Sequence, residues 1–287
     1  MKARQLFLQC LPDLDEHESQ ALFFLIIEHL TGLDRTRALL TENHGITSDL
    51  ETAYLDVLRA LSLGVPVQYA LGAADFCGLR IKVNKNVLIP RPETQELVRL
   101  AHVRAKNNRR EPFSVLDIGT GSGCIAIALD HLLRVEKKTL LIDAVDVSPA
   151  ALRTARSNAQ ALGADIRFEL ANVLMQDFLH RQGDYDLIIS NPPYIRHSES
   201  ATMERNVLDY EPHQALFVPD DDPLRFYRAI ARYASQHLRK EPGSALWLEI
   251  NQALGDETSR LVSSFGFHCQ IMQDSYGKDR FLCATPV

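Results

Sequence analysis

The chain has 287 residues, of which 46% are hydrophobic and 24% charged, and its formal net charge is −6 at pH 7. This length exceeds one ordinary domain and can bury a sizeable core. The acidic balance argues against an enzyme that neutralises many duplex-DNA phosphates, and five scattered cysteines without C-x-x-C spacing indicate neither disulfides nor a metal site. In chain order, residues 1–5 lack the apolar core and cleavage site of a secretory signal, so cytoplasmic residence is expected.

Residues 1–75 are predicted to form a small helical bundle. Apolar residues recur there at helical spacing, and helix breaks are expected near Pro12, Gly32 and Gly45. The apolar run 21–27 is far too short to span a membrane, and a glutamate and a histidine follow it directly. It is therefore predicted to be a buried helix, and no membrane association is expected.

A connecting β-hairpin is predicted over residues 76–92. Apolar and polar residues alternate in 79–83 and 87–89, on either side of a turn at 84–86. The hairpin is expected to end in Pro90-Arg91-Pro92, where proline restricts the backbone and marks the passage to the rest of the chain.

A glycine-rich loop follows the next predicted strand. The strand 114–118 contains Asp117 and runs into Gly119-Thr120-Gly121-Ser122-Gly123, and a helix is predicted over 124–133. Cys124 stands where the dinucleotide fingerprint G-x-G-x-x-G has its last glycine, so a pyrophosphate cradle is not favoured. The alternate glycines let a bulky zwitterionic cofactor approach the backbone, and Asp117 can meet an ammonium or sulfonium group. S-adenosylmethionine fits these demands better than NAD, and a purely structural tight turn is the alternative.

Two further strands are predicted to end at polar residues. The strand 140–145 delivers Asp146 about twenty residues beyond the glycine-rich loop, where it can bind ribose hydroxyls. The strand 165–170 leads to Asn172 and Val173, where an adenine-binding pair is expected if the sheet carries an adenosyl cofactor. Taken singly, Asp146 is better explained as a solvated strand-end acid, and the pair as a loop asparagine followed by a core valine. The register of Asp146 with the glycine-rich loop favours its functional interpretation.

The most informative residues are Asn191-Pro192-Pro193-Tyr194, which directly follow the apolar run 185–190. The Asn191 side-chain oxygen can accept one N–H of a planar NH2 group, and the Pro192 carbonyl can accept the other. The prolines restrict the backbone, so both acceptors are held before a substrate arrives, and Tyr194 can stack on a flat amide. This combination suits methylation of an amide or amino nitrogen. The alternative is a proline turn that closes a buried strand.

Residues 93–287 are predicted to form an α/β domain with a mostly parallel sheet, since strands and helices alternate from about residue 114. In such a sheet the carboxyl ends of the strands share one edge, where ligands bind. The glycine-rich loop, Asp146 and Asn191 all follow strands, so they are expected to border one crevice. Three more strands are predicted, the last two as an antiparallel edge: 245–250, 267–272 and 281–284.

The sequence resembles the glutamine N5-methyltransferases of the HemK type, a family that modifies peptide chain release factors. The resemblance is carried by these segments: Leu88 to Thr94, Asp117 to Gly123, Asp146, Asn191 to Tyr194, Tyr210 to His213, and Asp274 with Gly277 to Phe281. The Ile-Pro-Arg-Pro-Glu-Thr part is the most specific, because Asn-Pro-Pro-Tyr also occurs in other nitrogen methyltransferases, including DNA adenine enzymes.

The resemblance implies an S-adenosylmethionine-dependent methyltransferase domain of Rossmann-like fold over 93–287, preceded by a helical domain that recognises the substrate. It implies methyl transfer to the side-chain amide of the glutamine in the Gly-Gly-Gln motif of release factors. Implied cofactor contacts are Asp117, Gly119, Thr120, Gly121, Ser122, Gly123, Asp146, Asn172, Val173 and Asn191. Implied substrate contacts are Arg91, Glu93, Asn191, Pro192, Pro193 and Tyr194, of which the last four are also the implied catalytic residues.

The chain departs from the family at two places, and other activities remain open. The family commonly has Asp-Trp at Asn172-Val173 and a third acidic residue at Gln95. A sister family methylates a glutamine of a large-subunit ribosomal protein, but its proline-arginine segment looks different. An adenine-N6 nucleic-acid methyltransferase and a non-catalytic adenosyl-binding module are further alternatives, although no direct contact with nucleic acid is expected.

Overall fold

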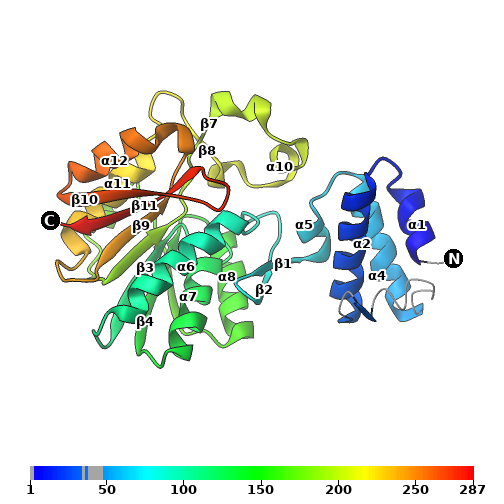
Figure 1. The fold of residues 1–287 in the computed structure, drawn as a ribbon, viewed down its shortest axis with the longest axis horizontal. Coiled ribbons are helices and arrows are strands. Elements are labelled where there is room, and N and C mark those ends of the chain that lie inside the picture. Colours follow the sequence, from blue (N-terminus) through cyan, green and yellow to red (C-terminus); the bar gives the residue numbers. More distant parts are fainter. Residues whose placement is uncertain (1–2, 34–35, 38–47) are drawn as a thin grey trace. The chain divides into compact units, whose positions relative to one another are not determined.

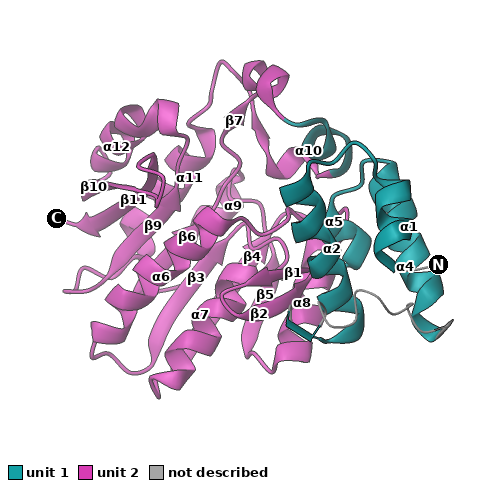
Figure 2. Ribbon diagram, turned by 45° about the vertical axis from the view of Figure 1, so that its right-hand side comes forward, with its two compact units in different colours: residues 1–73, 204–210 teal, residues 74–203, 211–287 magenta. Residues whose placement is uncertain are grey.

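The computed structural model describes residues 3–33, 36–37 and 48–287. The chain divides into two compact units (Figure 2). Unit 1 comprises residues 1–73 and 204–210, and unit 2 comprises residues 74–203 and 211–287. The helix break predicted near Gly45 lies outside the described residues. No helix in the described ranges combines the length and the apolar character that crossing a membrane requires.

Unit 1 is helical, as predicted. In chain order its described elements include α1 (Ala3–Cys10), α2 (Glu16–Thr31), α4 (Ser48–Ser62), α5 (Val67–Leu71) and α10 (Arg205–Tyr210) (Figure 1). Helix α2 begins where the Asp15 side chain accepts a hydrogen bond from the Glu18 N–H, and it ends at Gly32 with a φ of 70°. Phe7, Phe23 and Tyr54 are among the buried residues that join α1, α2 and α4 in one apolar core.

The connecting hairpin lies earlier in the chain than predicted. Strands β1 (Ala73–Phe76) and β2 (Leu79–Lys82) pair around Cys77-Gly78, and both turn residues have positive φ, 51° and 79°. Positive φ at two central residues is the mark of a tight type I′ hairpin. The prediction of a strand at 87–89 was wrong: this segment belongs to no strand, because the Val87 N–H donates to the Asn84 carbonyl and the Ile89 N–H donates to Glu211. Its alternation reflects burial of Val87 and Ile89.

In the described part of unit 2, seven strands form one sheet in the order β10-β11-β9-β6-β3-β4-β5. The strands are β3 (Phe113–Ile118), β4 (Leu140–Asp146), β5 (Ile166–Leu170), β6 (Leu187–Ser190), β9 (Ala245–Glu249), β10 (Phe267–Gln273) and β11 (Asp279–Pro286). Pairing is parallel from β5 to β9 and antiparallel between β9, β11 and β10. The predicted α/β fold with an antiparallel edge is confirmed.

Helices cover both faces of this sheet (Figure 1). One face carries α6 (Pro92–Asn107), α7 (Cys124–Val135) and α8 (Pro149–Leu162). The other carries α9 (Gln176–Leu179), α11 (Arg225–His237) and α12 (Gly255–Ser263), which share a core with alternate residues of the strands. Between β6 and α11 lie a short parallel pair, β7 (Ile195–Arg196) and β8 (Phe217–Val218), and the 3-10 turns His197–Thr202 and His213–Ala215.

The register of the sheet brings several strand ends into one row. Ile118 at the end of β3 lies opposite Val145 of β4 and Ser190 of β6, and Ser190 lies opposite Leu248 of β9. The chain runs outward from β3 to β5 and then returns to β6 on the other side of β3. This reversal is the point where open α/β sheets form a ligand crevice.

Candidate active site

A cavity opens at the carboxyl ends of β3, β4, β5 and β6, as predicted from the order of the motifs. The predicted site residues that line it are Gly119, Gly121, Asp146, Asn172, Val173, Asn191, Pro192 and Pro193. Pro212, Gln214 and Ala215 border it from the segment that follows the Tyr-Glu-Pro-His motif. The other predicted site residues lie outside the lining: Arg91, Glu93, Asp117, Thr120, Ser122, Gly123 and Tyr194.

Asp146 ties the glycine-rich loop to the end of β4. Its Oδ2 accepts a hydrogen bond from the Gly121 N–H at 2.9 Å, and its Oδ1 accepts one from the Ser148 N–H at 2.8 Å. Burial raises the pKa of this carboxyl, and the backbone donors act in the opposite direction. The carboxylate is thus held at the cavity wall, and each oxygen has a second lone pair with which to accept a ligand hydroxyl.

Two of the loop glycines serve different needs. Gly121 has a φ of 56°, and a Cβ added there would meet no atom within 4 Å, so the backbone borders open space. Gly123 has a φ of 83°, and its added Cβ would lie 3.0 Å from Ile127 Cδ1 and 3.2 Å from Ala155 Cβ. Gly123 therefore allows α7 and α8 to approach closely, whereas Gly121 leaves room for a ligand.

Asn172 holds its own turn at the far side of the cavity. Its Oδ1 accepts a hydrogen bond from the Leu174 N–H at 3.0 Å, which directs the carboxamide oxygen into the turn. Its Nδ2 is the donor end of the same amide, and Val173 adds apolar surface to the cavity and to the core of α11. The adenine contact of this pair stays a prediction.

Asp117 does not line the cavity. It is fully buried, its Oδ2 accepts a hydrogen bond from Thr120 Oγ1 at 2.6 Å, and burial raises its pKa to about 7. Thr120 and Ser122 are buried as well, so the side chains of the loop alternate with the cavity-lining glycines. Direct contact of Asp117, Thr120 and Ser122 with a cofactor stays a prediction.

The raised pKa of Asp117 predicts a pH dependence of stability. Between about pH 4, where an unfolded aspartate titrates, and about pH 7, the folded protein keeps a proton that the unfolded chain has released. The contribution to stability is therefore complete below this window, is lost as the pH rises through it, and is flat above. In the wild type, the free energy of unfolding should fall by an amount on the order of 2 kcal/mol between about pH 5 and about pH 8, and in Asp117→Asn this fall should be absent. Urea unfolding at the two pH values measures it. Equal pH dependence in the two proteins would contradict this assignment.

Asn191 is the half-buried residue that follows β6, and its amide has a defined direction. Its Nδ2 donates to Thr94 Oγ1 at 3.0 Å, and Thr94 Oγ1 donates to Glu249 Oε2 at 2.7 Å. Since the nitrogen is engaged with Thr94, Oδ1 is the end that a ligand N–H can use. This direction is the one that the predicted acceptor role requires, and contact of Asn191 with a substrate stays a prediction.

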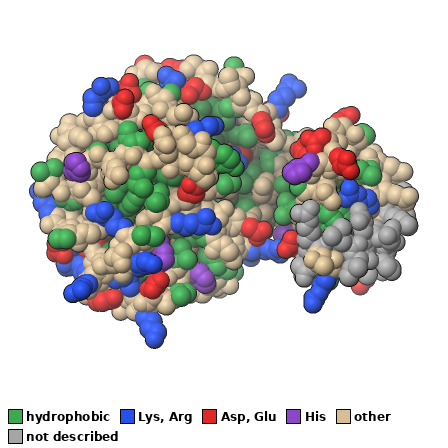
Figure 3. Space-filling model, in the orientation of Figure 1, with side chains coloured by type: hydrophobic (Ala, Val, Ile, Leu, Met, Phe, Trp, Pro, Cys, Tyr) green, Lys and Arg blue, Asp and Glu red, His purple; other side chains and the backbone are tan. Residues whose placement is uncertain are grey.

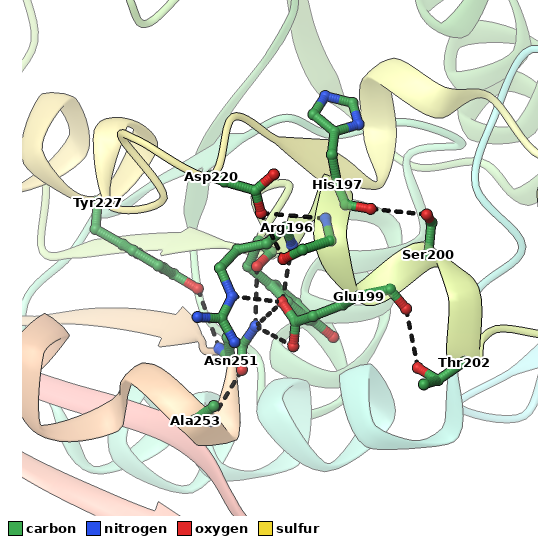
Figure 4. A network of polar contacts seen from close by, with 11 residues as sticks. Arg196, His197, Glu199, Ser200, Thr202, Asp220, Tyr227, Asn251 and Ala253 are labelled. Atoms are coloured by element: carbon green, nitrogen blue, oxygen red, sulfur yellow. Dashed lines mark hydrogen bonds and ion pairs between the residues drawn. The ribbon is translucent and has the colours of Figure 1, made fainter.

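Tyr194 is held at both its hydroxyl and its backbone. The hydroxyl donates to Glu249 Oε1 at 3.0 Å, and the Tyr194 carbonyl accepts a hydrogen bond from Asn251 Nδ2 at 3.1 Å. Asn251 also donates to Glu199 Oε2 at 3.1 Å, and its N–H donates to Tyr227 Oη at 3.3 Å (Figure 4). The Tyr194 ring packs against the core of α11 and α12. Stacking of this ring on a substrate amide stays a prediction.

Arg91 joins two of the motifs that carry the family resemblance. Its guanidinium pairs with Glu211 at 2.5 Å, and Glu211 also accepts a hydrogen bond from the Ile89 N–H at 3.1 Å. Because Glu211 is buried, this pair fastens the residues before α6 to the segment that borders the cavity. Glu93 lies in the first turn of α6. Substrate contacts of Arg91 and Glu93 stay predictions.

Three residues of the site received no role from the sequence. Thr94 was part of a recognised motif, but Glu249 and Asn251 belong to β9 and the residues after it, where no motif was seen. The available signal was an acidic residue at the end of an apolar strand. Only the strand order shows that this end lies next to Asn191, because Ser190 and Leu248 are partners in the register.

Comparison with known proteins gives concordant matches over both parts of the chain. Residues 2–72 match the PrmC N-terminal domain, and residues 99–209 match the Methyltransferase small domain. A release factor glutamine methyltransferase of Bacteroides thetaiotaomicron is 42% identical over 270 residues, which cover 93% of each chain. The protein of the same name from Flavobacterium psychrophilum is 40% identical, over 97% of this chain and 96% of its own.

A solved structure shows the same fold without close sequence similarity. The catalytic domain of hMettl16, in complex with the MAT2A 3′UTR hairpin 6, has a TM-score of 0.54 and 16% sequence identity. The match covers 80% of this chain and 82% of that chain. At this level of identity the likeness concerns the fold alone.

Proposed function

Because the chain belongs to the family of release factor glutamine methyltransferases, we propose that it methylates the glutamine of the Gly-Gly-Gln motif in peptide chain release factors. The accepting atom is the side-chain amide nitrogen, N5, and the methyl donor is S-adenosylmethionine. The observation that carries the proposal is the Asn191 acceptor beside the glycine-rich loop, at the ends of the adjacent strands β3 and β6.

The residues that line the cavity suit an adenosyl cofactor. Gly119 and Gly121 leave the loop backbone bare, Asp146 offers carboxylate oxygens at the end of β4, and Val173 supplies apolar surface. These residues would hold the cofactor between the loop and the end of β5. When bound, S-adenosylmethionine would supply the sulfonium methyl group to the amide nitrogen and would leave as the neutral thioether.

The protein contributes position and polarity to this reaction. An amide nitrogen is a weak nucleophile, because its lone pair is delocalised into the carbonyl, so holding it in the reactive orientation supplies much of the rate. Asn191 Oδ1 and the Pro192 carbonyl accept its two N–H bonds and stabilise the positive charge that develops on nitrogen. A dedicated general base is not needed, because the proton becomes acidic only after the new bond forms and can leave to water or a carbonyl.

The direct test uses purified protein, a purified release factor and methyl-labelled S-adenosylmethionine. Mass analysis of the Gly-Gly-Gln peptide should show the added mass of one methyl group on the glutamine. A release factor with alanine in place of that glutamine is the control and should take up no label. Parallel reactions contain a large-subunit ribosomal protein and an adenine-containing nucleic acid. Label in either of these, with none in the release factor, would refute the proposal.

Two observations favour the release factor over these other acceptors. Arg91 and Thr94 of the Ile-Pro-Arg-Pro-Glu-Thr segment both have buried partners, Glu211 and Glu249, so this specific motif is integrated into the site. On the face of unit 2 shown in Figure 3, Lys and Arg side chains are interspersed with Asp and Glu, a pattern unlike a basic nucleic-acid footprint. A translation factor as substrate is in keeping with the expected cytoplasmic residence.

The two loop glycines give a prediction about cofactor binding. Gly121→Ala and Gly123→Ala both introduce a Cβ at positive φ, so the backbone strain is shared and the difference reports the surroundings. Gly123→Ala should lower the free energy of unfolding more, because its Cβ meets Ile127 and Ala155. Gly121→Ala should weaken S-adenosylmethionine binding more, because its Cβ enters the cavity. Thermal unfolding and calorimetric titration measure the two effects, and the reverse order would contradict the proposed placement.

A further inference from the structure

A chain of buried and partly buried hydrogen bonds connects Asn191 to residues outside the cavity. It runs from Asn191 Nδ2 to Thr94 Oγ1, from Thr94 Oγ1 to Glu249 Oε2, and from Tyr194 Oη to Glu249 Oε1, over distances of 3.0, 2.7 and 3.0 Å. Thr94 is 3% exposed and Glu249 is 1% exposed, so water cannot replace these bonds freely. Four side chains from three parts of the sequence thus form one polar unit behind the cavity.

The charge of Glu249 sets the direction of every bond in this unit. An ionised carboxylate only accepts hydrogen bonds, so Thr94 and Tyr194 must both donate to it. The single hydroxyl proton of Thr94 is then committed, and the lone pairs of Oγ1 can only accept from Asn191. A threonine in this state excludes the flipped amide, because Oδ1 and Oγ1 would face each other with no proton between them. Asn191 is therefore fixed with its nitrogen toward Thr94 and its oxygen available to a ligand.

We propose that Thr94 and Glu249 are positioning residues that fix the direction of the Asn191 amide and thereby make the pocket accept an NH2 group. The inference rests on the proposed function and deepens it. A flipped Asn191 would present its own NH2 to the substrate NH2, two donors with no acceptor between them. The pair Thr94 and Glu249 prevents this arrangement without touching the substrate.

The surroundings of Glu249 contain both charge signs. Glu93 and Thr94 face it from α6, Tyr194 from the residues after β6, Tyr227 from α11, and Arg280 from β11. Burial raises the pKa of Glu249, while the donors Thr94 and Tyr194 and the charge of Arg280 lower it, and burial prevails. On protonation, Glu249 gains a donor of its own, so the imposed direction is lost. Turnover should therefore fall on the acid side, beginning above the pH where an ordinary glutamate titrates.

The first test compares three threonine variants. Thr94→Val keeps the shape of the side chain and removes the hydroxyl, and kcat should fall about tenfold, the factor expected for one net hydrogen bond. The dissociation constant of S-adenosylmethionine should stay as in the wild type. Thr94→Ser restores the hydroxyl and should recover most of the lost turnover. Thr258→Val is the matched control, since Thr258 is a buried helical threonine on α12 whose hydroxyl has no partner among the described residues.

The second test replaces the charge of Glu249. Glu249→Gln can donate to Thr94, which frees the threonine proton to bond Asn191 Oδ1 and permits the flipped amide. Turnover should be lower than in the wild type at every pH, and the acid limb of the kcat profile that belongs to Glu249 should be absent. A Glu249→Gln profile with the wild-type limb, or wild-type kcat in Thr94→Val, overturns the inference.

A measurement without turnover separates this inference from the proposed function. In cofactor-free protein, the side-chain amide resonances of Asn191, identified by their loss in Asn191→Ala, should shift and exchange faster with water in Thr94→Val, but not in Thr94→Ser. Unchanged resonances refute the positioning role, whatever the substrate is. Absence of methyl transfer by the wild type to the release factor refutes the proposed function alone, and kcat is then compared on the acceptor that takes up label.

Discussion

Replacing Asn191 with alanine should reduce kcat for glutamine methylation by about a hundredfold to a thousandfold, the range found when one preorganised polar group is removed from an active site. In the proposed mechanism, Asn191 Oδ1 holds the substrate amide and stabilises the charge that develops on its nitrogen. The proposed cofactor contacts are mainly the glycine-rich loop and Asp146. The dissociation constant of the cofactor should therefore change by less than about threefold. A large loss of kcat with little change in cofactor affinity indicates an interaction that is made in the transition state.

Single-turnover methylation of a release factor measures the chemical step, and calorimetric titration of S-adenosylmethionine measures binding. Asn107→Ala is the matched control, since Asn107 is exposed on α6 and its side chain donates to the Val103 carbonyl of its own helix. This variant should behave as the wild type. Equal losses of turnover and cofactor affinity in Asn191→Ala would show that Asn191 serves the cofactor and not the substrate.

Replacing Asp146 with alanine should have the opposite effect. The substitution removes the carboxylate that faces the cavity and also releases the Gly121 and Ser148 N–H groups, so the loop loses its attachment to β4. Hydrogen bonds to a charged group contribute about 1.5–3 kcal/mol, so the dissociation constant of S-adenosylmethionine should rise about tenfold to a hundredfold. At saturating cofactor, kcat should remain near the wild-type value.

Two variants control for this prediction. Asp146→Asn keeps one acceptor for the backbone donors and should bind the cofactor with intermediate affinity. Asp165→Ala removes an exposed carboxylate before β5 and should leave binding unchanged. A loss of kcat in Asp146→Ala that saturating cofactor cannot restore would place the residue in the chemical step and would contradict its proposed role.

Much of the α/β domain could be predicted, because its signals are local. An apolar run followed by a break predicts each of three strands, those that end before Gly119, Asp146 and Asn191. In a parallel sheet such breaks fall at one edge, and the structure does bring these three positions to one cavity. The order of motifs along the chain was sufficient here, because the geometry of the sheet turns order in sequence into proximity in space.

Pairings over long separations could not be predicted in the same way. The hairpin forms around Cys77-Gly78. Residues 84–87 do form a turn, since the Val87 N–H donates to the Asn84 carbonyl, but no second strand follows it, and Lys82 and Asn84 bond to Asn158 and Thr154 of α8. The alternation of Val87 and Ile89 records burial, which a strand and an unpaired extended segment share. The alternation of apolar and polar residues indicates which side chains are buried. It does not indicate with which other segment the backbone forms hydrogen bonds.

The amino-acid sequence by itself determined the α/β class, the position of the glycine-rich loop and the residue that we propose accepts the substrate amide, since each depends on a short run of neighbouring residues. Only the tertiary structure decided which way that amide faces. Its direction depends on Thr94 and Glu249, 97 residues before Asn191 and 58 residues after it. The physical reason is that a carboxamide has a donor end and an acceptor end of nearly equal size, so the hydrogen-bond partners that folding brings together must distinguish them.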